Sequence, residues 1–391
     1  MDELAQQIGN AFRCLRWLPA YGWQWLARRR PRADVVHLVI ALADHFEPSI
    51  VPGAPRAYAS FAEQERRVEW WCSEYPKTVE AWRDADGRPL RHTYFYPAEQ
   101  YGKALIDRLA EHCRAGWGEI EIHLHHGVEA ADTAENTRRV LLEFRDALAE
   151  HGCLSRWNGQ GAPCYAFVHG NWALANSDAG RNCGVDDEMQ ILAETGCYAD
   201  LTLPSAPHPT QVRKINALYE CALPLDRRAP HRRGRDLRQG HTPRRFPLII
   251  QGPLGLDFAR RVWGWPVPCI DAGALTTLHP PTIHRLQLWR RSAITVKDRP
   301  DWIFIKLHCH GMDPRDEAAM LGSPMQRFLF ELTAEANASS GYRVHFVTAR
   351  EMVNIILAAC DGRDGNPGDY REYRLRLLTP CEPREAHFSG Q

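Results

Sequence analysis

Seven short runs rich in apolar, β-branched and aromatic residues are spaced along the chain and separated by longer, more polar segments. Several runs are continuously apolar, as expected of parallel strands that are covered on both faces. These patterns predict seven strands. They lie at residues 35–43, 119–124, 164–168, 199–203, 247–251, 302–307 and 343–347.

Helical patterns fill the stretches between these runs. The clearest covers 133–151, where Asp132 is the predicted N-cap before apolar positions at helical spacing. A second covers 349–360, where Thr348 and Glu351 form a predicted capping box. Strands that alternate with helices at this chain length predict an α/β fold, either a right-handed β/α barrel or an open doubly wound sheet.

The predicted organisation is one catalytic α/β domain over residues 34–360, with peripheral segments. An N-terminal helix is expected within 1–33 and a polar tail over 361–391, in which 370–378 alternates well enough for an edge strand. Arginines gather among prolines and glycines at 226–246. This stretch is predicted to leave the barrel, either as a solvated loop or as a lid that attracts an anionic substrate.

Composition limits the classes of partner and of site. The 48 basic residues balance the 48 acidic ones, so nucleic acid is not an expected partner. The 12 cysteines stand singly, without the pairs of a zinc ribbon or the density of a disulfide scaffold, and are expected to be reduced. The sequence has neither a signal-peptide pattern nor an apolar window long enough to span a membrane. The cytoplasm is the expected location.

One segment could associate the chain with the inner face of a membrane. Residues 11–32 interleave tryptophans and a tyrosine with arginines, a composition that suits a helix lying in the headgroup layer. The alternative is a helix that caps the domain and keeps its arginines in water. Peripheral membrane contact through 11–32 is therefore one of two interpretations.

Polar clusters follow directly after five of the apolar runs. In an α/β barrel the carboxyl ends of all parallel strands lie on one face, so residues far apart in sequence converge there. The clusters consist of Asp44, His45 and Glu47; His123, His125 and His126; His169, Asn171 and Trp172; Ser205, His208 and Gln211; and His308 and His310.

The segment HLHHG at 123–127 has the spacing of metal ligands. His123 and His125 are two apart on a predicted strand, so their side chains project to one face. Two imidazoles and one further ligand leave a divalent ion an open position for water. His126 stands where the strand gives way to a loop, and it could turn toward the same ion or support the ligands from outside.

The first cluster could complete such a centre. Asp44 is a candidate general base that takes a proton from metal-bound water, and His45 is a candidate ligand. The alternative is that Asp44 caps a turn while Glu47 only ends the strand.

The last cluster offers a proton donor. His308 is the candidate general acid, and His310, on the same strand face, is expected to contact substrate. Cys309 between them should point to the opposite face, which argues against a cysteine nucleophile paired with either histidine.

An imidazole, an amide and an indole stand together in HGNWALANS at 169–177. His169, Asn171 and Trp172 suit a sugar, whose hydroxyls need hydrogen-bond partners and whose C–H face packs on an aromatic ring. The alternative for Trp172 is a place in the core.

The order of these motifs resembles the polysaccharide deacetylase, or NodB-homology, family of metal-dependent carbohydrate esterases. The likeness covers roughly 34–360, more in the order and spacing of elements than in identical residues. It implies a distorted seven-stranded (β/α)7-type barrel with the motifs at strand ends. The segments ADHFEP, HLHHG, HGNWAL, LPSAPHPTQ and KLHCHG would be the signatures of a divergent branch.

The resemblance implies roles for individual residues. Asp44 stands where the family has its base, and His45 where the family has a metal-binding aspartate. The family has two metal histidines four apart, whereas HLHHG is spaced differently, so His123, His125, His126 and Glu129 all remain candidate ligands. HGNWAL lies where a motif shapes the substrate groove, and Leu307–His308 matches the motif of the catalytic acid.

The implied function is removal of an acyl group, N-acetyl in the first instance, from a glycan or lipid-linked sugar by metal-activated water. Zinc is the expected ion because the candidate ligands are mostly imidazoles, although other first-row ions also suit imidazole. One alternative is a glycoside hydrolase, which needs two facing carboxylates; its candidates are Asp44, Glu47, Glu129 and Asp200. Another alternative is an inactive glycan-binding protein.

Overall fold

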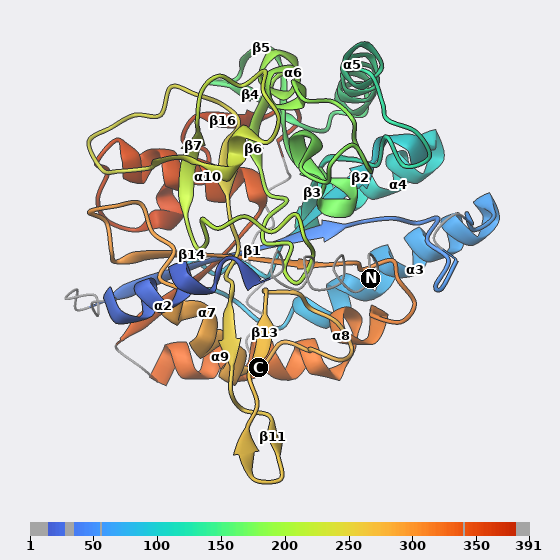
Figure 1. The fold of residues 1–391 in the computed structure, drawn as a ribbon. Helices are drawn as coiled ribbons and strands as arrows, with labels where there is room; N and C mark the ends of the chain where they lie inside the picture. The colour runs from blue at the N-terminus through green and yellow to red at the C-terminus, as the bar shows by residue number, and fades with distance from the viewer. Residues whose placement is uncertain (1–14, 28–34, 55–56, 339–340, 381–391) are drawn as a thin grey trace.

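A computed structural model of the chain describes residues 15–27, 35–54, 57–338 and 341–380. Its centre is a curved sheet with the strand order β14-β1-β2-β3-β5-β6-β9-β7-β8 (Figure 1). From β14 to β9 neighbouring strands are parallel, while β7 and β8 are added antiparallel. The strands are β1 (Val36–His45), β2 (His92–Pro97), β3 (Gly118–Leu124), β5 (Gln160–His169), β6 (Cys197–Asp200), β7 (Leu218–Cys221), β8 (Gly234–Asp236), β9 (Leu248–Ile250) and β14 (Trp302–Cys309).

All seven predicted strands are present in this sheet. The last of them, β15 (Tyr342–Val347), pairs with the first half of β1, and β2 pairs with the second half on the same side. Within the predicted edge segment, β16 (Leu375–Leu377) pairs with β4 (Ser155–Trp157), which in turn extends from β5. Strand β2 was not predicted, although all six of its residues are buried.

The α/β class is thus confirmed, but the distorted (β/α)7-type barrel implied by the resemblance is not. The sheet ends in antiparallel β7 and β8, and segment 294–297 stands between β8 and β14 in place of a strand. Backbone N–H groups of Lys297 and Phe304 donate to Leu237 and Ile294 there, at 2.9 and 2.8 Å. The described part of the sheet is therefore a curled half-barrel whose remaining side is filled by irregular chain.

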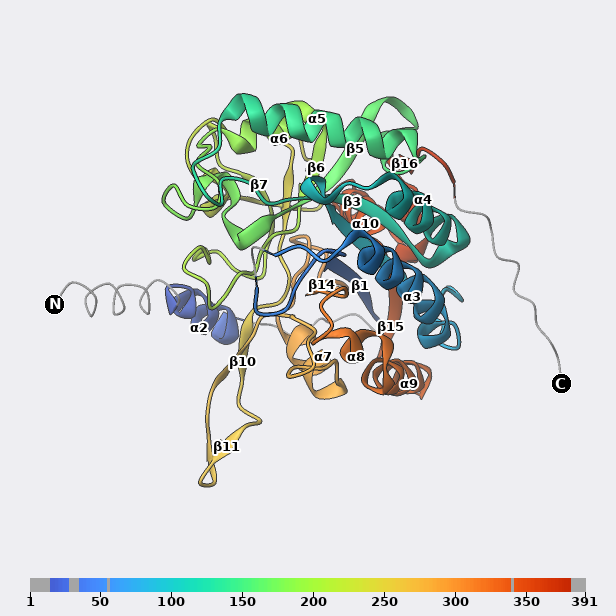
Figure 2. The same cartoon turned by 90° about the vertical axis from the view of Figure 1, so that its right-hand side faces the viewer.

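Helices cover the outer, convex face of the sheet. Figure 2 shows α3, α4 and α5 over this face, and their buried apolar residues belong to the same core cluster as the even-numbered residues of β1, such as Leu38, Ile40 and Leu42. The outer helices are α3 (Phe61–Val79), α4 (Lys103–His112), α5 (Ala134–Glu150), α6 (Glu188–Thr195), α7 (Ile283–Arg291), α8 (Glu317–Leu321) and α9 (Ser323–Ala338).

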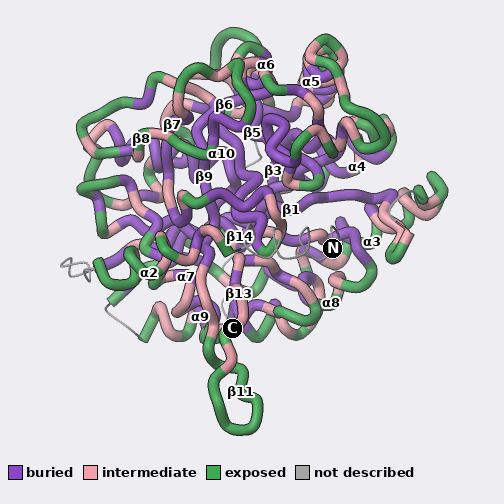
Figure 3. The backbone as a smooth tube through the Cα atoms, in the orientation of Figure 1, coloured by how far each residue is buried: buried purple, intermediate pink, exposed green. Residues whose placement is uncertain are grey.

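One helix, α10 (Ala349–Cys360), lies inside the curl. All of its residues are buried, and it packs on the inner side of β1, where Val39, Ala41 and Ala43 leave room for it (Figure 3). The predicted capping box is confirmed, because the Thr348 hydroxyl accepts from the Glu351 amide and the Glu351 carboxylate accepts from the Thr348 amide. By contrast, Thr133 rather than Asp132 caps α5.

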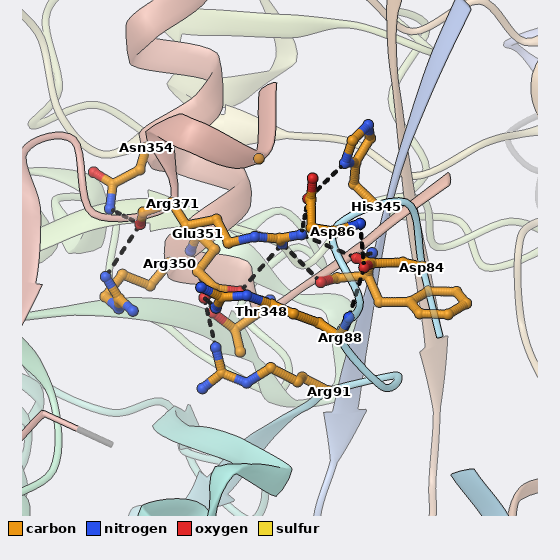
Figure 4. A network of polar contacts seen from close by, with 12 residues as sticks. Asp84, Asp86, Arg88, Arg91, His345, Thr348, Arg350, Glu351, Asn354 and Arg371 are labelled. Carbon is orange, nitrogen blue, oxygen red and sulfur yellow. Dashed lines mark hydrogen bonds and ion pairs between the residues drawn. The ribbon is translucent and has the colours of Figure 1, made fainter. Parts of the chain in front are cut away.

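Buried ion pairs fix the first turn of α10 (Figure 4). Arg350, which has no exposed side-chain surface, donates to both oxygens of Glu119 at 2.9 and 2.7 Å. The Glu351 carboxylate is paired with Arg91, and Arg371 lies 2.9 Å from Asp84. These charges satisfy one another, which is the condition under which ionised groups are stable in a protein interior.

The peripheral segments are attached to this body. The arginine-rich segment 226–246 contains β8, and Arg235 within it pairs with Glu220 of β7. Helix α2 (Leu18–Ala27) is preceded by Trp17, which is fully buried. A two-stranded hairpin, β10 (Gly255–Asp257) with β13 (Cys269–Asp271), continues into a projecting tip made of β11 (Arg261–Val262) and β12 (Trp265–Pro266) (Figures 1 and 2). The ten described cysteines are all free.

Candidate metal centre

Imidazoles gather where β1, β3 and β14 end on the inner side of the sheet. His45 continues the inward-facing row of Ala41 and Ala43, because alternate residues of a strand point to the same face. Its ring centroid lies 4.8 Å from that of His123 and 4.7 Å from that of His310. The predicted convergence of His45, His123 and His310 is therefore present, and His125 joins them through its ring contact with His123 at 4.5 Å.

A carboxylate stands at the centre of this cluster. Glu47 Oε1 lies 3.2 Å from His123 Nε2 and 3.1 Å from His125 Nε2. Sequence reasoning gave Glu47 no role in the metal site, yet the signal was available. Glu47 is two residues beyond His45, the same spacing that brings His123 and His125 to one face.

The remaining contacts define which nitrogens point into the cluster. His123 Nδ1 lies 2.7 Å from the Val168 carbonyl oxygen, so this nitrogen must carry the proton and donate it. His125 Nδ1 lies 2.7 Å from Glu99 Oε1 and is a donor for the same reason. The Nε2 atoms of His123 and His125 therefore face the Glu47 carboxylate. If both rings are neutral, this arrangement is repulsive unless a cation lies between them.

Electrostatics favour positive charge at this position, and a proton on His125 can supply it. Burial opposes the charged form of His125, but hydrogen bonds to Glu47 and Glu99 outweigh it and raise its pKa to about 10. For His45, burial and the neighbouring His310 and His123 lower the pKa well below the usual range. Positive charge is thus stabilised beside Glu47, while His45 is a neutral imidazole, the form that binds metal.

The donor set fits a divalent ion. His45, Glu47 and His123 each offer one ligand atom, and these atoms lie within 4.8 Å of one another. Two imidazoles and a carboxylate form a set found in catalytic zinc sites that keep a position for water. His125 can bind the ion as a further nitrogen ligand. Alternatively, held by Glu99, it can orient the ligands without binding the ion itself.

The structure does not bring Asp44 into this cluster. Asp44 is completely buried on the outer face, where its carboxylate lies 2.8 Å from His92 Nε2 and accepts from the Gly311 amide at 2.7 Å. Adjacent residues of a strand point to opposite faces, which explains why Asp44 and His45 separate. Cys309 also lies on that outer face, 3.9 Å from His92 Nε2, as its position between two inward histidines predicts.

His308 lies on the inner side of β14, with its ring centroid 6.3 Å from that of His45. Its Nδ1 atom is buried without a hydrogen-bond partner among the described residues. Burial and the neighbouring Lys306 lower the pKa of His308 well below its usual range. It is therefore a neutral imidazole with an available nitrogen at the edge of the cluster.

Two of the predicted site residues lie together elsewhere. His126 and His169 meet on the outer face of the sheet, with their Nε2 atoms 3.0 Å apart. Their other neighbours are Cys183 and Glu188, which sequence reasoning did not single out. The histidines of HLHHG at 123–127 thus belong to two clusters. His126 follows His125 by one position and points to the opposite face of the sheet.

The remaining candidates lie in loops that follow the carboxyl ends of the strands. Asn171 is exposed, and the Trp172 ring lies 5.3 Å from that of His208. Gln211 has a structural contact, since its side-chain oxygen accepts from the Ser205 amide at 2.8 Å. Glu129 is exposed.

A groove of about 610 Å³ opens beside the cluster. Polar groups in its lining include Glu99, His125, His126 and Asp132, while Tyr101, Val140 and Phe144 supply apolar and aromatic surface. A few polar groups in a groove with much apolar surface are typical of small-molecule sites.

Comparisons with known proteins found a likeness to a solved structure. No family model and no curated protein matches the chain. A solved structure from Mycobacterium smegmatis, provisionally described as a polysaccharide deacetylase, is similar to it with a TM-score of 0.43 and 15% identity. The match covers 87% of this chain and 96% of that chain.

Proposed function

We propose that this chain is a metal-dependent hydrolase that removes an acyl group, N-acetyl in the first instance, from a glycan or lipid-linked sugar. The observation that carries the proposal is the Glu47 carboxylate, which faces the Nε2 atoms of His123 and His125 while both Nδ1 atoms are already engaged. A divalent ion accounts for this convergence, and hydrolysis by activated water is the chemistry that an open imidazole–carboxylate site supports.

In this proposal His45, Glu47 and His123 hold the ion, zinc in the first instance, and His125 completes or supports the set. A bound divalent ion supplies an acidified water molecule and polarises the acyl oxygen. His308, neutral and with an unpartnered Nδ1, can hold and return a proton as the leaving group departs.

The proposal gives Asp44 a positioning role in place of the base expected from the family resemblance. Its carboxylate accepts from the backbone of Gly311, the residue after His310. Asp44 thereby holds the start of the loop that carries His310 toward His45.

The substrate class rests on the groove beside His125. Tyr101 and Phe144 can pack against the C–H face of a sugar ring, while Glu99 can accept from a hydroxyl. Glycoside hydrolysis is less well supported, since no contact among the described residues pairs any two of Asp44, Glu47, Glu129 and Asp200.

The test combines metal analysis with product detection. We expect the purified chain to contain metal and to release acetate from N-acetylated chitooligosaccharides or from p-nitrophenyl acetate, and chelation to abolish the release. His123→Ala should remove one metal equivalent and the activity, whereas His241→Ala, at an exposed histidine, should change neither.

Three outcomes would count against the proposal. A chain without stoichiometric metal would contradict the metal site. Reducing-sugar release without acetate release would favour a glycosidase. Saccharide binding that survives chelation, with no turnover of either substrate, would favour an inactive glycan-binding protein.

Asp44→Asn separates positioning from catalysis by a base. We expect it to retain the full metal content and to lower acetate release by about 10- to 100-fold, the range found when residues that orient site groups are changed. Metal analysis and initial rates measure the two effects. Loss of metal from folded Asp44→Asn would indicate that Asp44 is a metal ligand.

Membrane contact through residues 11–32 is a further proposal about the partner. Trp17 is buried, but Trp23 and Trp25 of α2 are 73% and 65% exposed, as is typical of rings that insert between headgroups. No described helix is both long and apolar enough to cross a bilayer. We expect co-sedimentation with anionic phosphatidylserine vesicles that a Trp23→Ala, Trp25→Ala variant loses. Equal sedimentation of both proteins would exclude this role for α2.

A further inference from the structure

A second cluster of metal-binding side chains lies on the outer face of the sheet, where one of its members, His126, also lines the groove. Its members come from four places in the fold: the end of β3, the end of β5, the loop before α6, and the first residue of α6. Each is at most 7% exposed. They are His126, His169, Cys183 and Glu188.

Strand geometry explains why this cluster is separate from the first. In β5, His169 follows Tyr165 and Phe167, whose side chains belong to the core under the outer helices. His126 stands directly after His125 and turns to the same outer side. The two clusters therefore lie on opposite faces of the sheet, and β3 leads to both of them.

The ligand atoms of the outer cluster converge on one point. His126 Nε2 lies 3.0 Å from His169 Nε2 and 2.9 Å from Glu188 Oε1, and His169 Nε2 lies 3.3 Å from the same oxygen. Zinc–nitrogen bonds of 2.0–2.1 Å place neighbouring ligands of a tetrahedron about 3.3 Å apart. Cys183 Sγ, 3.7 Å from Glu188 Oε2, is the fourth donor.

Contacts outside the cluster determine the tautomer of each histidine. His126 Nδ1 lies 2.9 Å from Asp132 Oδ2, an oxygen that also accepts from the Thr137 hydroxyl. His169 Nδ1 contacts the Gly170 carbonyl oxygen. Both Nδ1 atoms therefore donate, which leaves the Nε2 atom of each ring as its only possible metal ligand. A carboxylate or carbonyl partner on the distal nitrogen is typical of metal-bound histidine.

The charges of the four ligand groups also suit a cation. Thiolate, carboxylate and two imidazoles together carry the charge that a divalent ion would balance.

We infer that His126, His169, Cys183 and Glu188 bind a second divalent metal ion, zinc by ligand type, in a closed four-ligand site with a structural role. Mixed thiolate and imidazole ligation selects zinc among the abundant ions. The four ligands are buried and leave no open position, which distinguishes a structural site from a catalytic one.

The ion would stabilise the loop between β5 and α6. This loop, residues 170–187, has little regular structure and contains non-glycine residues with positive φ, such as Asn171, Trp172 and Ala175. Such backbone conformations persist only where surrounding contacts enforce them. A metal bound through His169, Cys183 and Glu188 would connect both ends of the loop to His126, at the end of β3. It would thereby fix the position of Trp172 near the carboxyl ends of the strands.

The test uses the full-length chain with its metal replaced by cobalt(II), because cobalt bound to a thiolate absorbs in the near ultraviolet by charge transfer. We expect the wild-type chain to bind two equivalents of cobalt and to show this absorption. Cys183→Ser should lose the absorption. His123→Ala, at the other cluster, should lose one equivalent but keep the absorption, so failure of the proposed function and failure of this inference give different results.

A second variant covers the case in which Cys183→Ser does not fold. Cys183→Asp can still offer an oxygen ligand, so it should bind two cobalt equivalents without the charge-transfer absorption. Cys221→Ser, at a buried cysteine outside both clusters, is the matched control and should resemble wild type. A cobalt-loaded wild-type chain that lacks the absorption, or an absorption that persists in folded Cys183→Asp, would overturn the inference.

Discussion

Replacement of Arg350 by methionine is expected to lower the free energy of unfolding by about 3 to 5 kcal/mol, the range for breaking a buried ion pair on one side. Arg350 is completely buried, and its guanidinium contacts Glu119, Glu372 and the Leu375 carbonyl oxygen. Methionine fills much of the volume but leaves Glu119, which is itself buried, without its closest cation. Urea unfolding followed by circular dichroism measures the change.

The control for this prediction is Arg376→Met. Arg376 is exposed on β16, two residues beyond Arg374, and a surface substitution of this kind should change stability by no more than about 0.5 kcal/mol. Equal unfolding midpoints for the two variants would mean that the ion pairs of Arg350 contribute little to fixing α10.

Glu47→Gln should have the largest effect on activity. We expect acetate release to fall by about 10²- to 10⁴-fold, the usual contribution of a group that handles protons or charge at the reacting centre. Glutamine keeps the shape of the side chain but removes the negative charge that both Nε2 atoms of His123 and His125 face. Steady-state rates and metal content of the same preparation measure the effect.

Glu129→Gln is the matched control, since Glu129 is exposed in the loop that follows the same strand as His123. Its rate should equal that of wild type. A Glu47→Gln protein that retains activity within tenfold would show that Glu47 is neither a ligand nor a charge partner in the reaction.

The sequence was sufficient for most of the sheet. Short runs rich in apolar, β-branched and aromatic residues predicted β1, β3, β5, β6, β9, β14 and β15, and several of these runs are continuous because the strands are covered on both faces. Strand β2 escaped because HTYFYP is short and mixes polar with aromatic residues. The distorted (β/α)7-type barrel implied by the resemblance is not confirmed, since a helix rather than layered side chains occupies the inside of the curl. The largely apolar sequence of α10 is typical of a buried helix, but it does not say on which face of the sheet the helix lies.

The part of the candidate site that lies on strands was predictable from the alternation of side chains along a strand. Alternation brings His123 and His125 together, and applied to β1 it also pairs His45 with Glu47 and separates both from Asp44. Position in a family motif argues instead for Asp44, so the two criteria disagree there. Cys183 and Glu188 were beyond sequence reasoning, because they reach the outer cluster through an irregular loop whose path depends on tertiary contacts.

The internal position of α10 means that the fold can form completely only late in protein synthesis. Strand β1 is near the start of the chain, yet its inner face is covered by α10 and half of one edge by β15, both near the end. During synthesis, that surface stays uncovered until almost the whole polypeptide has left the ribosome. A nascent chain stalled before residue 349 would expose the apolar inside of the sheet and depend on chaperones to avoid aggregation.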